Sequence, residues 1–459
     1  MKSNKDPIVV IGMGCVYPGA HSPEELWQNV LAGRRYFRNA PDERLPKKDY
    51  FDPNKYAPGK TYCDKMAVIT DWEFDPLEFQ IPPISVYTSD IAHWLALYTA
   101  REAIKNSGLN LDEIDRTKIG VIIGNTLTGE FSRSHNLMFR WPYVERSIRR
   151  ALSGSSESYV DSVVEMVGKV YKAPLPEITE DSLPGNMSNT IAGRICNTFD
   201  LGGGCYTVDG ACSSSLLSIA HACSALLDGE MDVAVAGGVD VSLDPFEIIG
   251  FAKTTALSAD DIRPYDEHAE GLLPGEGCGI VLLARESFAK KIGAKIYAAV
   301  PGWGYSSDGS AGITAPEVEG QMRALKKTYK RAGYPISDVQ LIEGHGTGTT
   351  LGDKVEVSAI MQLLEQDNKN SICKIGSIKS NIGHCKAAAG AAAFIKAVMA
   401  LKNKIIPPTT NCEKPNASFG TPLSKLVPAF TGSAWEKDGS PRRASVSAMG
   451  FGGANSHIT

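Results

Sequence analysis

The chain has 459 residues, of which 43% are hydrophobic and 22% charged, so it can bury a large core and is neither a disordered nor a fibrous protein. The net charge of −5 is mixed along the sequence without a long basic run, which argues against a nucleic-acid partner. The N-terminus lacks the apolar core of a signal peptide, and no stretch of about eighteen residues is continuously apolar. We therefore expect a cytoplasmic protein with no membrane partner. The length leaves two packed halves and about three domains equally open.

Ten cysteines are too few for a disulfide scaffold in a chain of this length, and none stands in the C-x-x-C pairing typical of zinc sites. We therefore predict no metal site. Most of the cysteines should be reduced and buried, because cysteine packs as a small hydrophobic residue in protein cores.

Short β-rich runs alternate with amphipathic or alanine-rich segments along the chain. This pattern predicts an α/β fold in which parallel strands are joined by helical crossovers. Strands are expected at residues 8–11, 119–123, 205–208, 233–236, 280–283, 339–342, 375–378 and 444–447. Helices are expected at residues 92–106, 213–227, 320–331 and 385–402.

Gly12 and Gly14 follow the first predicted strand, at the spacing that opens a dinucleotide-binding fingerprint. Tyr17 occupies the position of the third glycine, so the fingerprint is incomplete. We interpret the two glycines as a tight turn at the end of the strand and expect no dinucleotide there.

Two long excursions interrupt the alternation of strands and helices. Residues 35–83 are rich in Pro, Asp and Tyr, and we expect them to wrap over the surface. Residues 126–184 are polar and aromatic without clear strand periodicity, which predicts a lobe inserted into the core fold. Excursions of this kind often shape a substrate entrance.

Cys212 lies where the predicted strand 205–208 turns at Asp209 and Gly210 and leads into a helix. At a helix N-terminus, unpaired N–H groups and the helix dipole favour a thiolate over a thiol. The same N–H groups point toward any acyl oxygen on the sulfur, which supplies half of an oxyanion hole. From this segment alone, a reactive thiol and a buried cysteine among small residues are equally supported.

His345 follows the strand predicted at residues 339–342, at the strand end where α/β folds place functional groups. Glycines at positions 344, 346 and 348 let a ligand or another segment approach the backbone closely. Thr347 and Thr349 present hydroxyls that could bond a flexible, amide-bearing arm. A histidine in this setting is a candidate functional residue.

His384 stands at the start of a helix made mostly of alanine, after a predicted strand and a polar loop. So small a helix surface implies close packing on all sides, and His384 should be partly buried. Lys379, five residues earlier, needs a compensating charge if it is buried as well, and Glu356 is the candidate.

One cysteine and two histidines suit a decarboxylating Claisen condensation. As carbon dioxide leaves a malonyl-type donor, the thioester oxygen becomes an enolate, which two imidazole N–H donors can stabilise. Thioester hydrolysis needs only one base.

Three motifs in this order, VDGACSSSL, EGHGTGT and KSNIGH, resemble the ketosynthase family of polyketide and fatty-acid synthases. The similarity extends over nearly the whole chain, from PIVVIGMGC through YDEHAEGLLPGEGCGIVLL to GFGGANSHI. Only residues 126–184 lack a motif of the family.

The resemblance implies the thiolase fold, a duplicated pair of α/β halves in a five-layered αβαβα core, normally a homodimer. Residues 1–260 would carry the nucleophile and the inserted lobe, and residues 261–459 both catalytic histidines. The chain would be a polyketide-type β-ketoacyl synthase that condenses an acyl chain with a malonyl-type extender on acyl carrier protein. It would bind no cofactor of its own, since substrates arrive on the phosphopantetheine of the carrier.

The family's catalytic roles carry over to five residues. Cys212 would accept the acyl chain, and His345 and His384 would assist decarboxylation and stabilise the enolate. Lys379 and Glu356 would form a supporting charged pair.

Three further residues match family positions around the substrate. Phe451 would gate the acyl pocket and complete the oxyanion hole with its backbone N–H, beside that of Cys212. Thr347 and Thr349 would contact the phosphopantetheine arm.

Several positions depart from the pattern of modular synthases. Gly210 and Gly344 stand where alanine is usual, and Lys354 stands where proline usually follows LGD. These variants are more similar to iterative synthases of the enediyne and polyunsaturated-fatty-acid types. The end of the chain directly after GANSHIT leads us to expect the N-terminal domain of a larger synthase, with other domains as partners.

Three alternative functions remain. A non-elongating relative, such as a loading decarboxylase or a chain-length-factor partner, would lose the cysteine or the histidine of HGTGT, and both are present. A second alternative is a Cys-His hydrolase or a thiolase-like cleavage enzyme. A thiolase would need a second cysteine near the C-terminal glycines, where GFGGANSH has none, whereas thioester hydrolysis without decarboxylation would favour the hydrolase. A purely structural role would leave all three motifs unexplained.

Overall fold

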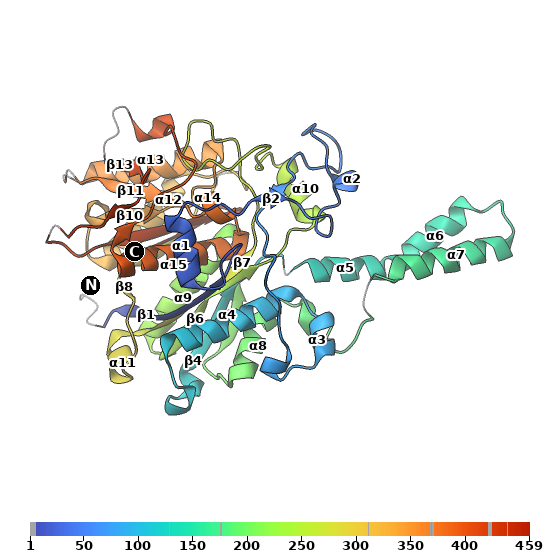
Figure 1. The fold of residues 1–459 in the computed structure, drawn as a ribbon, viewed down its shortest axis with the longest axis horizontal. Helices are drawn as coiled ribbons and strands as arrows, with labels where there is room; N and C mark the ends of the chain where they lie inside the picture. Colours follow the sequence, from blue (N-terminus) through green and yellow to red (C-terminus); the bar gives the residue numbers. More distant parts are fainter. Residues whose placement is uncertain are drawn as a thin grey trace.

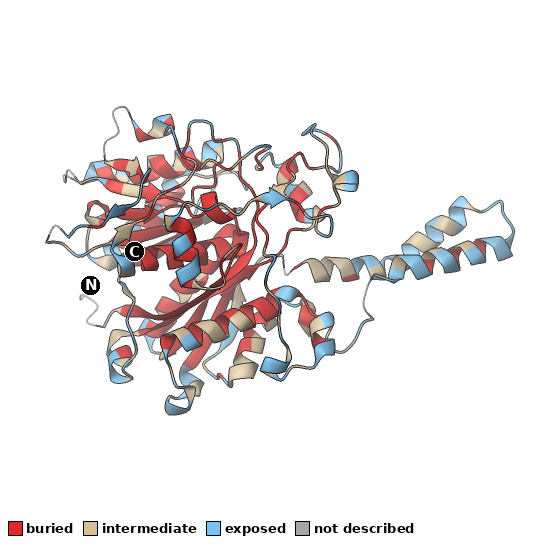
Figure 2. Ribbon diagram, viewed as in Figure 1, coloured by how far each residue is buried: buried red, intermediate tan, exposed pale blue. Residues whose placement is uncertain are grey.

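Two six-stranded β-sheets lie face to face with helices between them and on their outer sides (Figure 1). The computed structural model describes residues 6–127, 129–174, 177–310, 312–367, 369, 371–420, 425–437 and 439–459. Buried residues concentrate in the sheets and the helices between them, as Figure 2 shows.

The first sheet is mixed, with the strand order β5-β4-β6-β7-β1-β8. Strands β5, β4 and β6 are parallel, whereas β7 runs antiparallel to both β6 and β1, and β8 antiparallel to β1. The predicted parallel strands are present as β5, β4 and β6, and the antiparallel pairings of β7 and β8 extend the sheet beyond them. The strands are β1 (Ile8–Val16), β4 (Ile119–Gly124), β5 (Cys205–Val208), β6 (Val233–Asp240), β7 (Gly277–Arg285) and β8 (Ala298–Val300).

The second sheet has the order β13-β11-β10-β15-β16-β9. Its strands β11-β10-β15-β16-β9 repeat the pairing of β5-β4-β6-β7-β1, and β13 is added parallel to β11 at the edge. Strands β11, β10 and β15 are parallel, and β16 runs antiparallel to β15 and β9. The strands are β9 (Trp303–Ser307), β10 (Leu341–Glu343), β11 (Cys373–Gly376), β13 (Leu426–Pro428), β15 (Ala444–Gly450) and β16 (Ala454–Ile458).

The helices between the strands repeat in the same sequence in both halves. In the first half α4 (Ile91–Ser107), α8 (Asn189–Phe199) and α9 (Ser214–Asp228) follow β1, β4 and β5. In the second half α12 (Val318–Ala332), α13 (Thr350–Gln366) and α15 (Ala389–Asn403) follow β9, β10 and β11. Helices α9 and α15 pack on each other between the sheets, and the other four cover the outer faces. The predicted thiolase fold, a duplicated five-layered core, is confirmed.

Helix α15 is buried all round, as its alanine content predicts. Every residue from Ala389 to Ala400 is buried. At Gly390 an added Cβ would lie 2.9 Å from the Cβ of Leu216 on α9, so the two central helices are in close contact. This contact holds the turns before both helices near each other.

Strand β1 continues through Gly12 and Gly14 to Val16, so the predicted tight turn after residue 11 was wrong. The glycines serve helix packing instead. An added Cβ at Gly12 would meet the carbonyl oxygen of Ala103 at 2.6 Å, and one at Gly14 would meet that of Thr99 at 2.5 Å, both on α4. Because Gly12 and Gly14 have no side chains, α4 can lie directly on the sheet at these positions.

The predicted lobe is a helical arm that projects from the body (Figure 1). It consists of α5 (Glu130–Phe139), α6 (Trp141–Ala151) and α7 (Glu157–Lys172). Helices α6 and α7 form a hairpin around a small core of Trp141, Val160 and Val164. Residues 128, 175 and 176 of the predicted lobe lie outside the described residues.

The excursion at residues 35–83 covers the surface beside α10 (Pro245–Lys253), where Tyr62 donates a hydrogen bond to the carbonyl oxygen of Leu257 at 2.8 Å. The predicted division at residue 260 does not fall between the sheets, because β7 and β8 from beyond it belong to the first sheet. The remaining short elements are α1 (Pro23–Leu31), β2 (Arg38–Asn39), α2 (Lys47–Tyr50), β3 (Lys65–Met66), α3 (Pro83–Tyr87), α11 (Glu286–Lys291), α14 (Lys379–Ile382), β12 (Ile405–Ile406) and β14 (Ser433–Ala434).

Candidate active site

Cys212 sits in a 3₁₀ turn, Ala211–Ser213, between β5 and α9. Ala211 has φ +50, a left-handed conformation that costs energy for any residue other than glycine. The turn is held by its neighbours: Asp209 accepts a hydrogen bond from the N–H of Ala211 at 2.9 Å, and the Ser214 hydroxyl bonds both Gly210 and Ala211. A strained turn fixed in this way presents the sulfur in one orientation.

The environment of Cys212 opposes ionisation. Burial raises the pKa of the thiol to about 12, and Asp240 adds to the rise, while Lys379 and Lys386 offset part of it. The expectation that the helix terminus would favour a thiolate was therefore wrong for the free enzyme, because desolvation outweighs the helix dipole. Cys212 is therefore a thiol at neutral pH.

His345 follows β10, and two buried charged residues hold its backbone from either side. Glu356 accepts hydrogen bonds from the N–H of His345 at 2.7 Å and of Gly346 at 2.9 Å. The Lys379 ammonium donates to the carbonyl oxygen of His345. Lys379 and Glu356, both described, form no direct ion pair. Each bonds the backbone of His345, and an electrostatic attraction acts between them.

Both histidines are neutral and share one tautomer. The N–H of Met449 donates to Nδ1 of His345 at 3.3 Å, and the N–H of Lys386 donates to Nδ1 of His384 at 3.2 Å. Since each Nδ1 accepts, each proton sits on Nε2. Burial, together with Lys379, lowers the pKa of both imidazoles well below the usual value, so each presents a neutral N–H donor.

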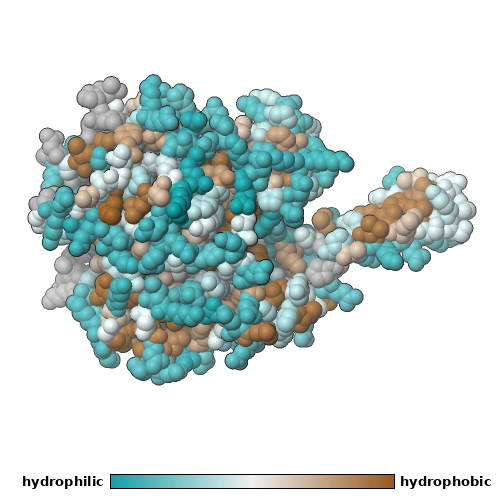
Figure 3. Space-filling view, in the orientation of Figure 1, coloured by the Kyte–Doolittle hydropathy of each residue, from teal (hydrophilic) through white to brown (hydrophobic). Residues whose placement is uncertain are grey.

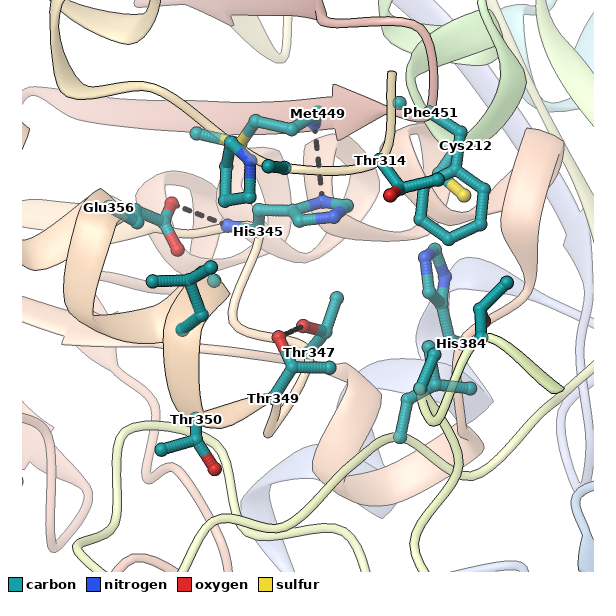
Figure 4. Close-up of a pocket in the computed structure, with 18 of the residues that line it drawn as sticks. Cys212, Thr314, His345, Thr347, Thr349, Thr350, Glu356, His384, Met449 and Phe451 are labelled. Carbon is teal, nitrogen blue, oxygen red and sulfur yellow. Dashed lines mark hydrogen bonds between the residues drawn. The ribbon is translucent and has the colours of Figure 1, made fainter. Parts of the chain in front are cut away.

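A cavity of about 400 Å³ brings the predicted residues together. Figure 4 shows Cys212, His345, His384 and Phe451 around it. The two imidazole rings lie 5.4 Å apart between centroids, with 84° between their planes. The Cys212 thiol and two N–H donors thus face the same space, whereas Lys379, which bonds the His345 carbonyl oxygen, is not among the residues that line it.

The threonines expected to bind phosphopantetheine line the same cavity. Thr347 and Thr349 hydroxyls are hydrogen-bonded to each other at 2.9 Å, as Figure 4 shows. Thr314 and Phe251 line the cavity as well.

The end of β15 packs directly on the nucleophile turn. An added Cβ at Gly450 would lie 2.0 Å from the carbonyl oxygen of Gly210 and 3.2 Å from the nitrogen of Cys212. Only glycine allows this approach, which brings the backbone of Phe451 beside Cys212. Phe451 is 43% exposed, and its ring centroid lies 5.9 Å from that of Phe251.

Two residues of the site were missed in the sequence. Asp353 accepts hydrogen bonds from the N–H groups of Thr347 at 3.0 Å and Gly348 at 3.2 Å, and burial raises its pKa to about 7. Tyr265 donates its hydroxyl to Glu356 at 3.0 Å. The LGD run after HGTGT is a local signal for Asp353. Tyr265 opens the YDEHAEGLLPGEGCGIVLL motif, but its hydrogen bond to Glu356, 91 positions away, is not visible in the sequence.

The described ranges contain no group of three or more His, Cys, Asp or Glu side chains arranged to hold a metal ion. No described helix is both long and apolar enough to cross a membrane. All ten cysteines are free, and eight of them are buried.

Two family models cover most of the chain. The N-terminal domain of β-ketoacyl synthases matches residues 5–289, and the C-terminal domain matches residues 297–413. A polyunsaturated fatty acid synthase polypeptide from Thraustochytrium is 37% identical over 98% of this chain, which spans 16% of that protein. Polyketide synthase PksL of Bacillus subtilis is 33% identical over 99% of this chain, which spans 9% of it.

Solved structures agree with these relatives. The ketosynthase from module 6 of the Bacillus subtilis bacillaene synthase superposes with a TM-score of 0.81 at 32% identity, covering 99% of this chain and 71% of that one. An oxazolomycin ketosynthase domain from Streptomyces albus gives a TM-score of 0.84 at 29% identity, covering 99% and 74%. The chain belongs to the β-ketoacyl synthase family and is a ketosynthase of the kind found in polyketide and polyunsaturated fatty acid synthases.

Proposed function

We propose that the chain catalyses decarboxylative condensation of an acyl chain on Cys212 with a malonyl-type extender on acyl carrier protein. The observation that carries the proposal is the pair of neutral Nε2–H donors facing the cavity that also contains the Cys212 sulfur.

In the first step, Cys212 attacks an acyl-pantetheine thioester. The new S–C bond replaces the pantetheine S–C bond, and the cysteine proton leaves with the pantetheine thiol. The N–H groups of Cys212 and Phe451, adjacent through Gly450, are suited to bind the developing oxyanion. This step transfers a proton without forming a free thiolate, in keeping with a thiol pKa of about 12.

In the second step, the malonyl-type thioester loses carbon dioxide. The electron pair of the broken C–C bond moves into the thioester as an enolate, whose oxygen accepts hydrogen bonds from His345 and His384. The enolate carbon then attacks the acyl carbonyl on Cys212. A C–C bond forms, the S–C bond breaks, and the sulfur takes up a proton, which leaves a 3-oxoacyl chain on the carrier.

The carrier's arm would bind in the part of the cavity that is lined by Thr347 and Thr349. Thr347 and Thr349 hydroxyls would bond the amides of phosphopantetheine, and Phe451, which is partly exposed, would gate the acyl pocket. Lys379 and Glu356 would fix His345. No bound cofactor has a part in these steps, and the chain would act in the cytoplasm together with the other domains of a larger synthase.

A homodimer is supported by two unpartnered surfaces. Strand β5 lies at the edge of its sheet with Cys205 and Tyr206 exposed, and an uncovered strand edge tends to pair. The projecting arm carries hydrophobic side chains on its outside, as Figure 3 shows. Those with more than half their surface exposed on the helices are Leu137, Phe139, Tyr143, Tyr159, Met166 and Val170.

Light scattering coupled to size exclusion tests the dimer. We expect twice the mass of 49.2 kDa for the chain and a shift to the monomer in Tyr206→Asp, with Tyr56→Asp, another exposed tyrosine, as control. A monomeric wild-type protein would contradict the proposed homodimer.

Intact-mass spectrometry with an acyl-pantetheine thioester, followed by malonyl-carrier protein, tests the reaction. The acyl mass should appear on the wild-type enzyme, be absent from Cys212→Ala, and move to the carrier as a 3-oxoacyl chain. An acyl mass that persists in Cys212→Ala would contradict the assignment of the nucleophile.

A further inference from the structure

Tyr265 is held in an unfavourable backbone conformation beneath the His345 loop. Its φ is +67, in the left-handed region that a bulky residue rarely adopts. Its N–H donates to the carboxylate of Asp353 at 2.6 Å, and its carbonyl oxygen accepts from the N–H of Asn416 at 2.9 Å. Its side chain is fully buried. Strain of this kind persists only where the surroundings fix it, and it concentrates at functional sites.

The phenol hydroxyl of Tyr265 connects this residue to the backbone of His345. It donates to Oε2 of Glu356 at 3.0 Å. The same carboxylate accepts the N–H of His345 at 2.7 Å on Oε1 and the N–H of Gly346 at 2.9 Å on Oε2. Tyr265 therefore bonds the group that orients the histidine, and its main chain bonds Asp353, which holds Thr347.

The glycines on either side of His345 lie in close contact with the phenol of Tyr265. An added Cβ at Gly344 would lie 1.9 Å from the Tyr265 hydroxyl oxygen, and one at Gly346 would lie 2.7 Å from it. The histidine loop thus packs against the hydroxyl with no room for a side chain at position 344. The Tyr265 hydroxyl thus occupies the space that a side chain at position 344 would need.

We propose that Tyr265 is a positioning residue for His345, and that its hydroxyl and Gly344 act as a matched pair that sets the orientation of the histidine through Glu356. The inference rests on the proposed role of His345 in decarboxylation. Tyr265 itself does not line the cavity, so it acts only through its neighbours.

The first test is Tyr265→Phe, which removes the hydroxyl and keeps the ring. Carbon dioxide release from malonyl-carrier protein should fall about 10-fold in kcat, because small displacements of a catalytic group are costly. Acylation of Cys212, which does not use His345, should change by less than about twofold. Tyr329→Phe, at a buried tyrosine whose hydroxyl bonds Ser445 and His457, is the control and should leave both rates unchanged.

The second test places alanine at position 344 in two backgrounds. In the wild-type enzyme, Gly344→Ala should slow carbon dioxide release by about 100-fold or prevent folding, because its Cβ meets the hydroxyl. In Tyr265→Phe the nearest atoms become Glu356 Oε1 at 3.0 Å and the ring Cζ at 3.1 Å, which small shifts relieve. The double variant should therefore fold and release carbon dioxide within about threefold of Tyr265→Phe.

The outcomes separate this inference from the function on which it depends. Equal losses from Gly344→Ala in both backgrounds, or equal losses of acylation and decarboxylation in Tyr265→Phe, would overturn the matched pair. If His345→Ala left carbon dioxide release unchanged, the role of His345 would itself be wrong. If carbon dioxide release is slow in His345→Ala but unchanged in Tyr265→Phe, the positioning role of Tyr265 is wrong while the role of His345 stands.

Discussion

The imidazole rings of His345 and His384 lie edge to face, 5.4 Å apart between centroids and 84° between planes. Each accepts a backbone N–H at Nδ1, so each offers Nε2–H to the cavity. Because burial keeps both rings neutral, they can donate hydrogen bonds to the enolate of the proposed reaction but supply no positive charge.

Neutral histidines predict a flat pH profile for carbon dioxide release between about pH 8 and pH 6. The pKa of each imidazole is lowered, so the neutral donor persists as the pH falls through 6.5, the usual value, and is lost only well below it. Initial rates of labelled carbon dioxide release from malonyl-carrier protein measure this profile. A tenfold fall in rate per pH unit beginning at 6.5 would show that an ordinary histidine is involved.

Alkylation of Cys212 should be slow at neutral pH and should accelerate with rising pH. Burial raises the thiol pKa to about 12, so the thiolate fraction grows about tenfold per pH unit up to that value. Iodoacetamide labelling of Cys212, followed by peptide mass spectrometry between pH 7 and 10, measures it. Cys205, which is exposed, provides an internal comparison and should react sooner. A labelling rate that levels off near pH 7 would mean that the helix terminus dominates after all.

Lys379→Met should impair decarboxylation more than acylation. The variant keeps the length of the side chain but removes the hydrogen bond to the His345 carbonyl oxygen and a buried positive charge. We expect carbon dioxide release to fall about 10- to 100-fold, with Lys402→Met at the surface as control. Circular dichroism checks that the variant is folded. A folded Lys379→Met enzyme that releases carbon dioxide at the wild-type rate would show that Lys379 does not support decarboxylation.

Gly12→Ala should destabilise the fold, because its Cβ would meet the Ala103 carbonyl oxygen at 2.6 Å. Overpacking of this kind costs about 1–3 kcal/mol in the free energy of unfolding, measured by urea denaturation. Gly154→Ala, where an added Cβ meets nothing within 4 Å, should cost less than about 0.5 kcal/mol. Equal stabilities of the two variants would show that β1 and α4 are not packed as described.

The sequence predicted the central elements well where hydrophobic runs are long. β5 was expected at residues 205–208 and lies there, and α4 differs from its prediction by one residue at each end. Helices α9 and α15 begin later than expected, because a 3₁₀ turn precedes each of them, Ala211–Ser213 and Lys386–Ala388. The role of Gly12 was misjudged, since contact with α4 is a tertiary effect that no local pattern contains.

The sequence predicted which residues form the candidate site but not how they contact one another. Cys212, His345 and His384 line one cavity, as the motifs implied. The hydrogen bonds of Lys379 and Glu356 to opposite sides of His345 could not be read from spacing, because they depend on how α13 and α14 meet β10. The raised pKa of Cys212 likewise depends on burial, which the position at a helix start does not reveal.

Release of labelled carbon dioxide from malonyl-carrier protein tests the central claim most directly. The wild-type enzyme should release it while forming a 3-oxoacyl product, and His345→Ala and His384→Ala should each slow release by about 100- to 1,000-fold, the cost of losing one oxyanion donor. Cys212→Ala should form no 3-oxoacyl product. Hydrolysis of the malonyl thioester without loss of carbon dioxide, or release that is unaffected in both histidine variants, would contradict the account.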